Sequence, residues 1–168
     1  MEFYYRMFDN GTFCITSYKG DSEHIVIPDN RNVSILFDDL FKGHSEITSV
    51  TMPDTITDIG GFVFDGCTNL KEILLPPNLQ NMWQYAFTRC GIETITIPGS
   101  VNSIVPFTFN HCEQLKTVTF QEGTSKICAW AFKGCIALED VYLPKSLTEI
   151  HHNAFEGCNN VTFHYCDE

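Results

Sequence analysis

Residues 135–155 read CIALEDVYLPKSLTEIHHNAF, and residues 67–87 show the same arrangement as CTNLKEILLPPNLQNMWQYAF. Both stretches fit the pattern C-x-x-L-x-x-V-x-L-P-x-x-L-x-x-I-x-x-x-A-F, with conservative exchanges. The phenylalanine of this pattern recurs every 22 or 23 residues, as Phe41, Phe64, Phe87, Phe109, Phe132 and Phe155. The cysteine recurs in the same phase, as Cys67, Cys90, Cys112, Cys135 and Cys158. Several columns in one phase indicate a tandem array of about six units.

Each unit carries its apolar residues at fixed offsets, so a single coil cannot enclose them and must stack against its neighbours. The alternating, β-branched residues 141–143 predict a short strand, and Pro144 ends it because proline has no N–H to donate. Equivalent strands should pair in parallel at about 4.8 Å. We therefore expect a mainly β or α/β solenoid, a right-handed superhelix of 22–25-residue repeats. It should have a parallel concave sheet, and tight helical turns or irregular arcs on the convex side.

The repeated pattern closely resembles the BspA-type leucine-rich repeat of many bacterial proteins, over roughly residues 25–163. The resemblance implies a leucine-rich-repeat solenoid that binds a protein or peptide without catalysis. Relatives of this kind are often surface-exposed proteins implicated in adhesion or host contact. We expect one domain over residues 1–168, with an N-terminal cap at 1–24, repeats at 25–160 and a C-terminal end at 161–168.

Both ends of a solenoid need cover, because stacking leaves the core open there. The tripeptide Asp9-Asn10-Gly11 contains the strongest short hairpin signal, with bulky and polar residues alternating on both sides. We predict a capping hairpin with strands at 3–8 and 12–16. At the other end, NNVTFHYCDE predicts a last strand with an open edge, from which we expect a monomer or a weak end-to-end dimer.

Charge argues against nucleic acid as a partner. Ten basic and 21 acidic residues give a net charge of −11 without any basic cluster, so a phosphate backbone would be repelled. No apolar run approaches the ~20 residues of a membrane-spanning helix. The first residues, MEFYYRMFDN, lack the features of a secretory signal, which predicts a cytoplasmic protein as written. The family resemblance instead suggests the cell surface or secretion.

The residues carry no recognisable catalytic motif: no G-x-S-x-G, P-loop, Gly-rich dinucleotide motif or H-E-x-x-H occurs. We therefore expect no enzyme and no cofactor. The column cysteines should point inward as small apolar groups, and the lack of C-x-x-C disfavours a zinc or thioredoxin-like site. A metal site at Cys128, His151 and His152 stays open as a minor alternative, although two ligands in one column do not fix a zinc ion.

The outward positions of the predicted strands form ladders that could bind a partner. One ladder alternates in charge and is interpreted as stabilising: Thr48, Lys71, Glu93, Lys116 and Glu139. Another provides the weak candidate contact residues Leu74, Thr96, Thr119 and Tyr142. A second surface, which we call the aromatic stripe, consists of Phe62, Tyr85, Phe107 and Trp130, each two residues before a repeat phenylalanine. These rings could be solvent-facing contacts, or they could seal the core.

The sequence therefore predicts a non-catalytic module that binds protein or peptide. Two alternatives remain at this point: a carbohydrate-binding module that uses the aromatic stripe, and a structural element that associates with itself. No metal site and no catalytic residue are assigned.

Overall fold

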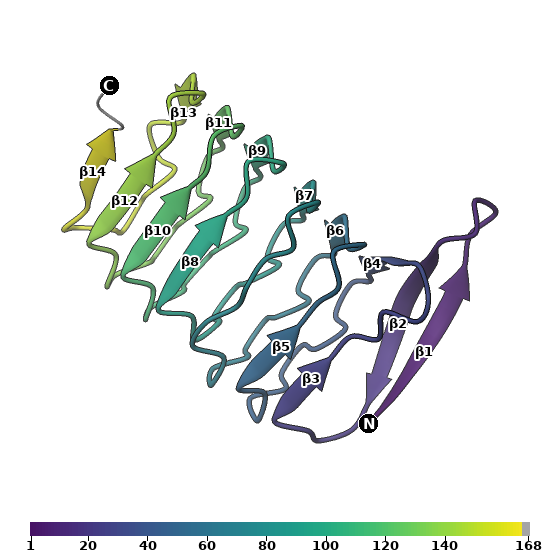
Figure 1. Cartoon of the computed structure of the whole chain (residues 1–168). Coiled ribbons are helices and arrows are strands. Elements are labelled where there is room, and N and C mark those ends of the chain that lie inside the picture. Colours follow the sequence, from purple (N-terminus) through teal and green to yellow (C-terminus); the bar gives the residue numbers. More distant parts are fainter. Residues whose placement is uncertain (166–168) are drawn as a thin grey trace.

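The computed structural model describes residues 1–165 of the chain. Its strands follow one another in coils that are piled along one axis, with the N-terminus at one end and β14 at the other (Figure 1). The solenoid has about seven turns, and the described residues form no helix. Accordingly, none of residues 1–165 belongs to a helix of the length and apolarity needed to cross a membrane.

An antiparallel hairpin covers the N-terminal end of the solenoid, as the sequence predicts. Its strands are β1 (Glu2–Met7) and β2 (Phe13–Lys19). Because β2 also pairs in parallel with β4 (Val33–Leu36), the hairpin continues directly into the coils. The ring of Phe3 meets that of Phe41 edge-on at 6.4 Å between centroids and so closes this end of the core.

The first strand layer contains the segments that the repeat pattern predicts as strands. Val118 pairs in parallel with Ile95 on one side and Val141 on the other, and all three side chains are buried. The strands of this layer are β3 (His24–Val26), β5 (Ser49–Thr51), β8 (Thr94–Ile97), β10 (Thr117–Phe120), β12 (Asp140–Leu143) and β14 (Thr162–Tyr165). The first layer therefore occupies the place of the predicted concave sheet.

A second strand layer follows the first in each coil, and the sequence analysis did not predict it. In this layer Ile127 pairs with Ile104 and Ile150. Besides β4, its strands are β6 (Asp58–Ile59), β7 (Asn81–Met82), β9 (Ser103–Ile104), β11 (Lys126–Ile127) and β13 (Glu149–Ile150). These pairs form because stacking at strand spacing brings the next segment of each coil to hydrogen-bond distance as well.

Tight turns close each coil, and none of residues 1–165 forms a helix there. Of the two predictions for the convex side, helical turns or irregular arcs, the structure therefore agrees with the irregular arcs. They contain left-handed backbone at a fixed position, which reads Gly43, Gly66, Arg89, His111, Gly134 and Gly157 with φ from 51° to 84°. Glycine adopts this conformation without steric strain. Arg89 and His111 therefore depart from the rule that the other four coils follow.

The core is a single internal column of phenylalanine rings, as predicted. Phe41, Phe64, Phe87, Phe109 and Phe132 are fully buried, with successive centroids 4.9–5.7 Å apart. Phe155 continues the stack 5.0 Å from Phe132 and is partly buried, because it lies near the C-terminal end. The column holds neighbouring coils together through apolar contact.

Both strand layers are interrupted around the third coil. Residues 73–75 form no strand and do not pair with β5 or β8, so the strand prediction is wrong for this unit. In the second layer β7 and β9 do not pair either. The connection after Cys90 is one residue shorter than in the other units, and a Cβ on Gly91 would lie only 1.9 Å from the carbonyl oxygen of Thr68. The shortened connection lies in the coil that contains β8 and β9, beside both interruptions.

Candidate functional site

The candidate residues of the first layer lie in one row across neighbouring coils. Thr119 stands beside Thr96 and Tyr142 in the parallel ladder. Leu74 belongs to the same row by its place in the repeat, and its side chain is 85% exposed, against 42% for Tyr142. The Tyr142 ring stacks on the imidazole of His164 with centroids 4.4 Å apart. The row thus presents two large apolar side chains to solvent, with threonines between them.

A depression of about 400 Å³, with Leu74 in its lining, lies where the first layer is interrupted. It is lined by parts of β5 and β8 and by residues 72–74. The backbone N–H and C=O groups of residues 72–75 make no hydrogen bond to any described residue. Backbone groups in folded proteins are normally paired, so these donors and acceptors are open to water or to a ligand.

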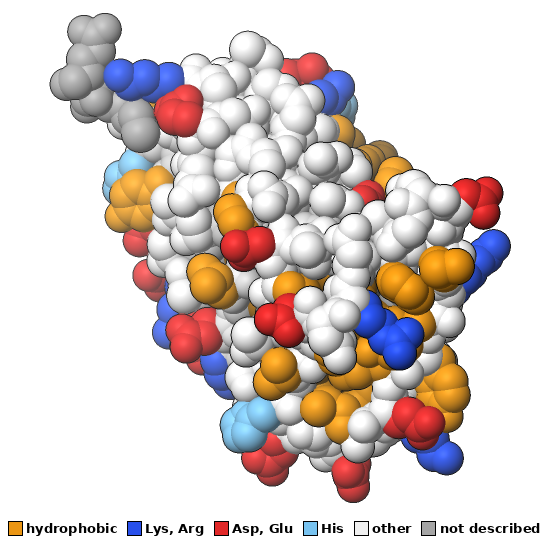
Figure 2. Space-filling model, turned by 45° about the vertical axis from the view of Figure 1, so that its right-hand side comes forward, with side chains coloured by type: hydrophobic (Ala, Val, Ile, Leu, Met, Phe, Trp, Pro, Cys, Tyr) orange, Lys and Arg blue, Asp and Glu red, His pale blue; other side chains and the backbone are white. Residues whose placement is uncertain are grey.

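The charge ladder of the first layer is only partly realised as ion pairs. Lys71 Nζ lies 4.0 Å from Glu93 Oε1, whereas Lys116 and Glu139 form no ion pair among residues 1–165. An exposed pair at this distance contributes little to stability. On the face that Figure 2 shows, side chains of both signs are interspersed with hydrophobic ones. The ladder itself alternates lysine and glutamate, so it offers charges of both signs rather than a field of one sign.

The four rings of the aromatic stripe stack face to face along the turns. Successive centroids of Phe62, Tyr85, Phe107 and Trp130 lie 4.8, 5.0 and 5.4 Å apart, and the ring planes differ by 10° or less. All four residues have left-handed backbone, with φ between 57° and 63°. Each side chain is partly buried. Strained backbone of this kind persists only where the surrounding packing imposes it.

The residues at both ends of the aromatic stripe contact charged side chains. The Lys42 ammonium lies 4.6 Å from the centroid of the Phe62 ring, and the Trp130 indole Nε1–H donates to Glu156 Oε2 at 3.0 Å. The inner faces of the rings therefore contact one another and the outer face of Phe62 contacts Lys42, whereas the Trp130 hydrogen bond lies in the plane of its ring and covers no flat face. Sugars bind to the open faces of aromatic rings, so this geometry favours a packing role for the stripe over a carbohydrate site.

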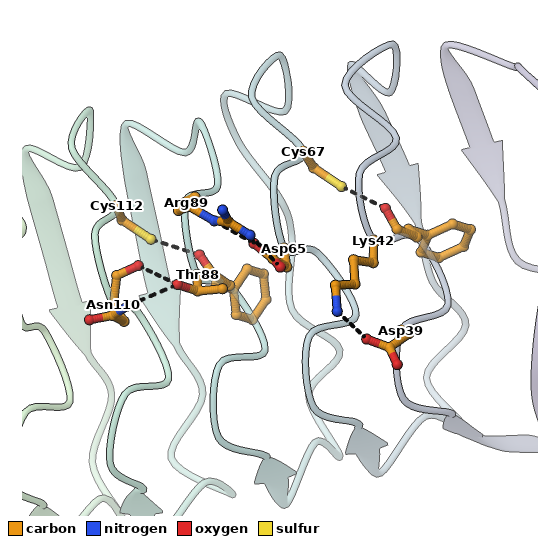
Figure 3. Close-up of polar contacts among 10 residues, drawn as sticks. Asp39, Lys42, Asp65, Cys67, Thr88, Arg89, Asn110 and Cys112 are labelled. Carbon is orange, nitrogen blue, oxygen red and sulfur yellow. Dashed lines mark hydrogen bonds and ion pairs between the residues drawn. The ribbon is translucent and has the colours of Figure 1, made fainter.

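Four of the five column thiols are buried and Cys158 is partly buried, and all five donate a hydrogen bond to a backbone carbonyl. Cys112 Sγ donates to the Phe87 carbonyl at 2.9 Å and Cys67 Sγ to the Phe41 carbonyl at 3.3 Å (Figure 3). Burial raises the pKa of the Cys67 thiol to about 12. Thiols with such a pKa are protonated at neutral pH and are therefore poor nucleophiles and metal ligands. Within residues 1–165 no group of three or more His, Cys, Asp or Glu side chains is placed to hold a metal ion.

One polar contact of the turns could not have been found from the sequence. Arg89 Nε and Nη2 donate to the two carboxylate oxygens of Asp65 at 2.9 and 2.8 Å, and Asp65 is 1% exposed (Figure 3). In the next coils Thr88 Oγ1 donates to the Asn110 carbonyl at 2.8 Å. Bidentate contact gives the Arg89 side chain a fixed orientation, at a left-handed position that glycine holds in four other coils.

Known proteins of similar structure are bacterial leucine-rich-repeat proteins. A leucine-rich-repeat protein of T. pallidum superposes with a TM-score of 0.90 at 30% identity, over 96% of this chain and 78% of that one. A leucine-rich cell surface protein of Faecalibacterium prausnitzii reaches a TM-score of 0.68 at 26% identity. A Bacteroides ovatus protein reaches 0.68 at 24% identity, which shows the fold alone. These two matches cover 96% and 97% of this chain but only 52% of each relative, so the chain spans about half the length of either protein.

The comparison with curated proteins gives no match. The family described as BspA type leucine-rich repeat region matches residues 34–162 in six copies. That range contains all six phenylalanines of the buried column. The chain therefore belongs to the BspA-type leucine-rich-repeat family.

Proposed function

We propose that this chain is a non-catalytic module that binds a protein or peptide through the first strand layer. The family supports the proposal in outline, because stacked repeats present long surfaces built from equivalent positions of successive coils. The candidate contact residues are Leu74, Thr96, Thr119 and Tyr142. The partner would lie across several coils, along the row that these residues form.

The exposure of Leu74 beside unpaired backbone is the observation that carries the proposal. Burying a leucine side chain contributes about 1.5–3 kcal/mol, and Leu74 is 85% exposed in the lining of a depression. An extended peptide could also hydrogen-bond with residues 72–75, whose backbone groups have no partner among residues 1–165. Tyr142 provides an aromatic anchor of the kind that is enriched at interfaces.

The absence of catalysis is part of the proposal. Burial raises the pKa of the Cys67, Cys90 and Cys135 thiols, and the row on the first layer contains no pair of groups suited to acid–base or nucleophilic chemistry. We also propose a location at the cell surface or outside the cell, by analogy with the relative whose name places it at the cell surface. The weak end-to-end dimer stays a prediction, which light scattering at high concentration would test.

The proposal is tested by capturing partners from the native environment with the whole chain and with Leu74→Ser and Tyr142→Ser. Ile136→Ser is a matched control, because Ile136 is 57% exposed and lies outside the row. We expect each change in the row to reduce capture of the same protein, whereas the control and all melting temperatures stay the same. Capture that is insensitive to both changes would place the partner on another face and refute the proposal.

A further inference from the structure

Trp83 differs from the other aromatic residues near the turns. Its indole is 50% exposed and follows β7 directly, between the second layer and the turns. The rings of the aromatic stripe stack on one another, whereas the Trp83 ring stacks on no ring within residues 1–165. The equivalent positions one coil before and after are Gly60 and Val105, so no aromatic ring is available to cover the indole.

A depression of about 500 Å³ lies beside this indole. It is lined by Asp38, Gly61, Trp83, Gln84, Val105 and Pro106. Two features open it: the pair Gly60-Gly61 provides no side chain, and the neighbouring strands β7 and β9 are not hydrogen-bonded. A Cβ on Gly61 would lie 3.2 Å from the Gln84 carbonyl oxygen, so even a methyl group would take up part of the space.

The carboxylate of Asp38 is held in place at this depression and has no positive partner. Asp38 Oδ1 accepts the backbone N–H of Gly61 at 2.8 Å, which fixes the side chain across two coils. Asp38 forms no ion pair among the described residues, and the lining contains no Lys, Arg or His. The depression therefore combines an uncompensated negative charge with an exposed indole.

A neighbouring group of residues shows how this chain fills such a combination elsewhere. Asp39 Oδ1 lies 3.1 Å from Lys42 Nζ, and the same ammonium lies 4.6 Å from the centre of the Phe62 ring (Figure 3 shows the ion pair). A carboxylate and an aromatic ring thus hold a cation between neighbouring coils. Asp38 and Trp83 offer the same two groups without a cation of this chain.

We propose that the Trp83 depression binds the cationic side chain of an arginine or lysine from a partner protein. The cation would lie against the indole, the ring that attracts cations most strongly, and pair with Asp38. The net charge of −11 would draw basic segments toward the chain. This contact goes beyond the proposed function, because it lies at the end of β7 rather than on the first layer.

Binding of hexa-arginine to the whole chain tests the proposal, with hexa-glutamate and chitohexaose as comparison probes. Trp130→Phe serves as background, because it leaves Trp83 as the only tryptophan and its fluorescence as the signal. At about 20 mM salt, where screening is weak, we expect saturable quenching by hexa-arginine alone. Asp38→Asn should weaken binding about 5-fold or more, since the amide oxygen still accepts the Gly61 N–H but the charge is lost.

Four further variants, two of them controls, separate the site from general attraction to an acidic surface. Asp29→Asn removes one exposed charge elsewhere and should change the dissociation constant less than about 2-fold. By calorimetry, Trp83→Leu should abolish saturable binding, whereas Phe37→Leu, which alters a ring that is 47% exposed, should not. Gly61→Ala should weaken binding by filling the depression.

Equal effects of Asp38→Asn and Asp29→Asn, or equal binding by Trp83→Leu and Phe37→Leu, would overturn the proposal. Absence of hexa-arginine binding would do so too, and binding of chitohexaose instead would assign the depression to a carbohydrate. Leu74→Ser and Tyr142→Ser should leave hexa-arginine binding unchanged, so the outcome is independent of the function proposed for the first layer.

Discussion

The stacked phenylalanine column makes a quantitative prediction about coupling between coils. Phe109 and Phe132 are both fully buried, with centroids 4.9 Å apart and planes 5° apart, whereas Phe64 is separated from Phe132 by two intervening rings of the column. Replacing either phenylalanine by Leu removes part of one ring's contacts, together with two ring–ring pairs for Phe109 and three for Phe132. We expect each change to lower the free energy of unfolding by about 2–3 kcal/mol.

The double variant decides whether the rings interact directly. Since the Phe109–Phe132 pair is lost only once, the double change should cost about 0.5–1.5 kcal/mol less than the two single changes together. For Phe64 and Phe132, three units apart in the repeat, the effects should add within about 0.5 kcal/mol. Urea unfolding followed by circular dichroism and by tryptophan fluorescence provides the measurement, provided that both signals change together. Equal coupling for the two pairs would refute the stacking argument.

Three further predictions concern the turns and the thiols. Gly91→Ala should lower the free energy of unfolding by more than about 3 kcal/mol, because the added Cβ would overlap the Thr68 carbonyl oxygen. Thermal unfolding measures the loss, with Gly61→Ala as the control, because a Cβ on Gly61 would lie 3.2 Å from its nearest neighbour. Arg89→Met should cost about 3 kcal/mol by leaving the Asp65 charge buried and unpaired, and adding Asp65→Asn should restore much of the loss in urea unfolding. Burial raises the pKa of Cys67 from an ordinary 9 to about 12, so the protonated thiol is favoured in the folded state. The stability that this thiol contributes is therefore complete below pH 9 and is lost as the pH rises from 9 to 12. Measuring the free energy of unfolding and the rate of thiol labelling over this pH range tests the prediction.

The repeat pattern predicted most features of the fold. The spacing of Phe64, Phe87 and their equivalents places each ring above the last, because coils of equal length superpose equal positions. The V-x-L-P segments and the Asn10-Gly11 turn were predictable for the same reason: local chemistry determines them. The sequence identified the aromatic stripe as a column of equivalent positions. It did not predict how far the rings are exposed, because periodicity does not tell which side of a coil faces solvent.

The interruption at the third coil is a loss of strand pairing between neighbouring coils, so it cannot be predicted from the residues of one repeat alone. The shortened connection at Gly91 is visible in the sequence, whereas the missing strand pairing beside it, in two layers, becomes visible only when the coils are packed on one another. Asp38 and Trp83 are separated by 45 positions and line one depression because the glycines between their coils leave space. By itself, the sequence determined the coil and its buried columns, since these repeat. Only the tertiary structure decided where the repetition fails, because a gap between coils is a property of their contact, and the depressions beside Leu74 and Trp83 lie at that gap.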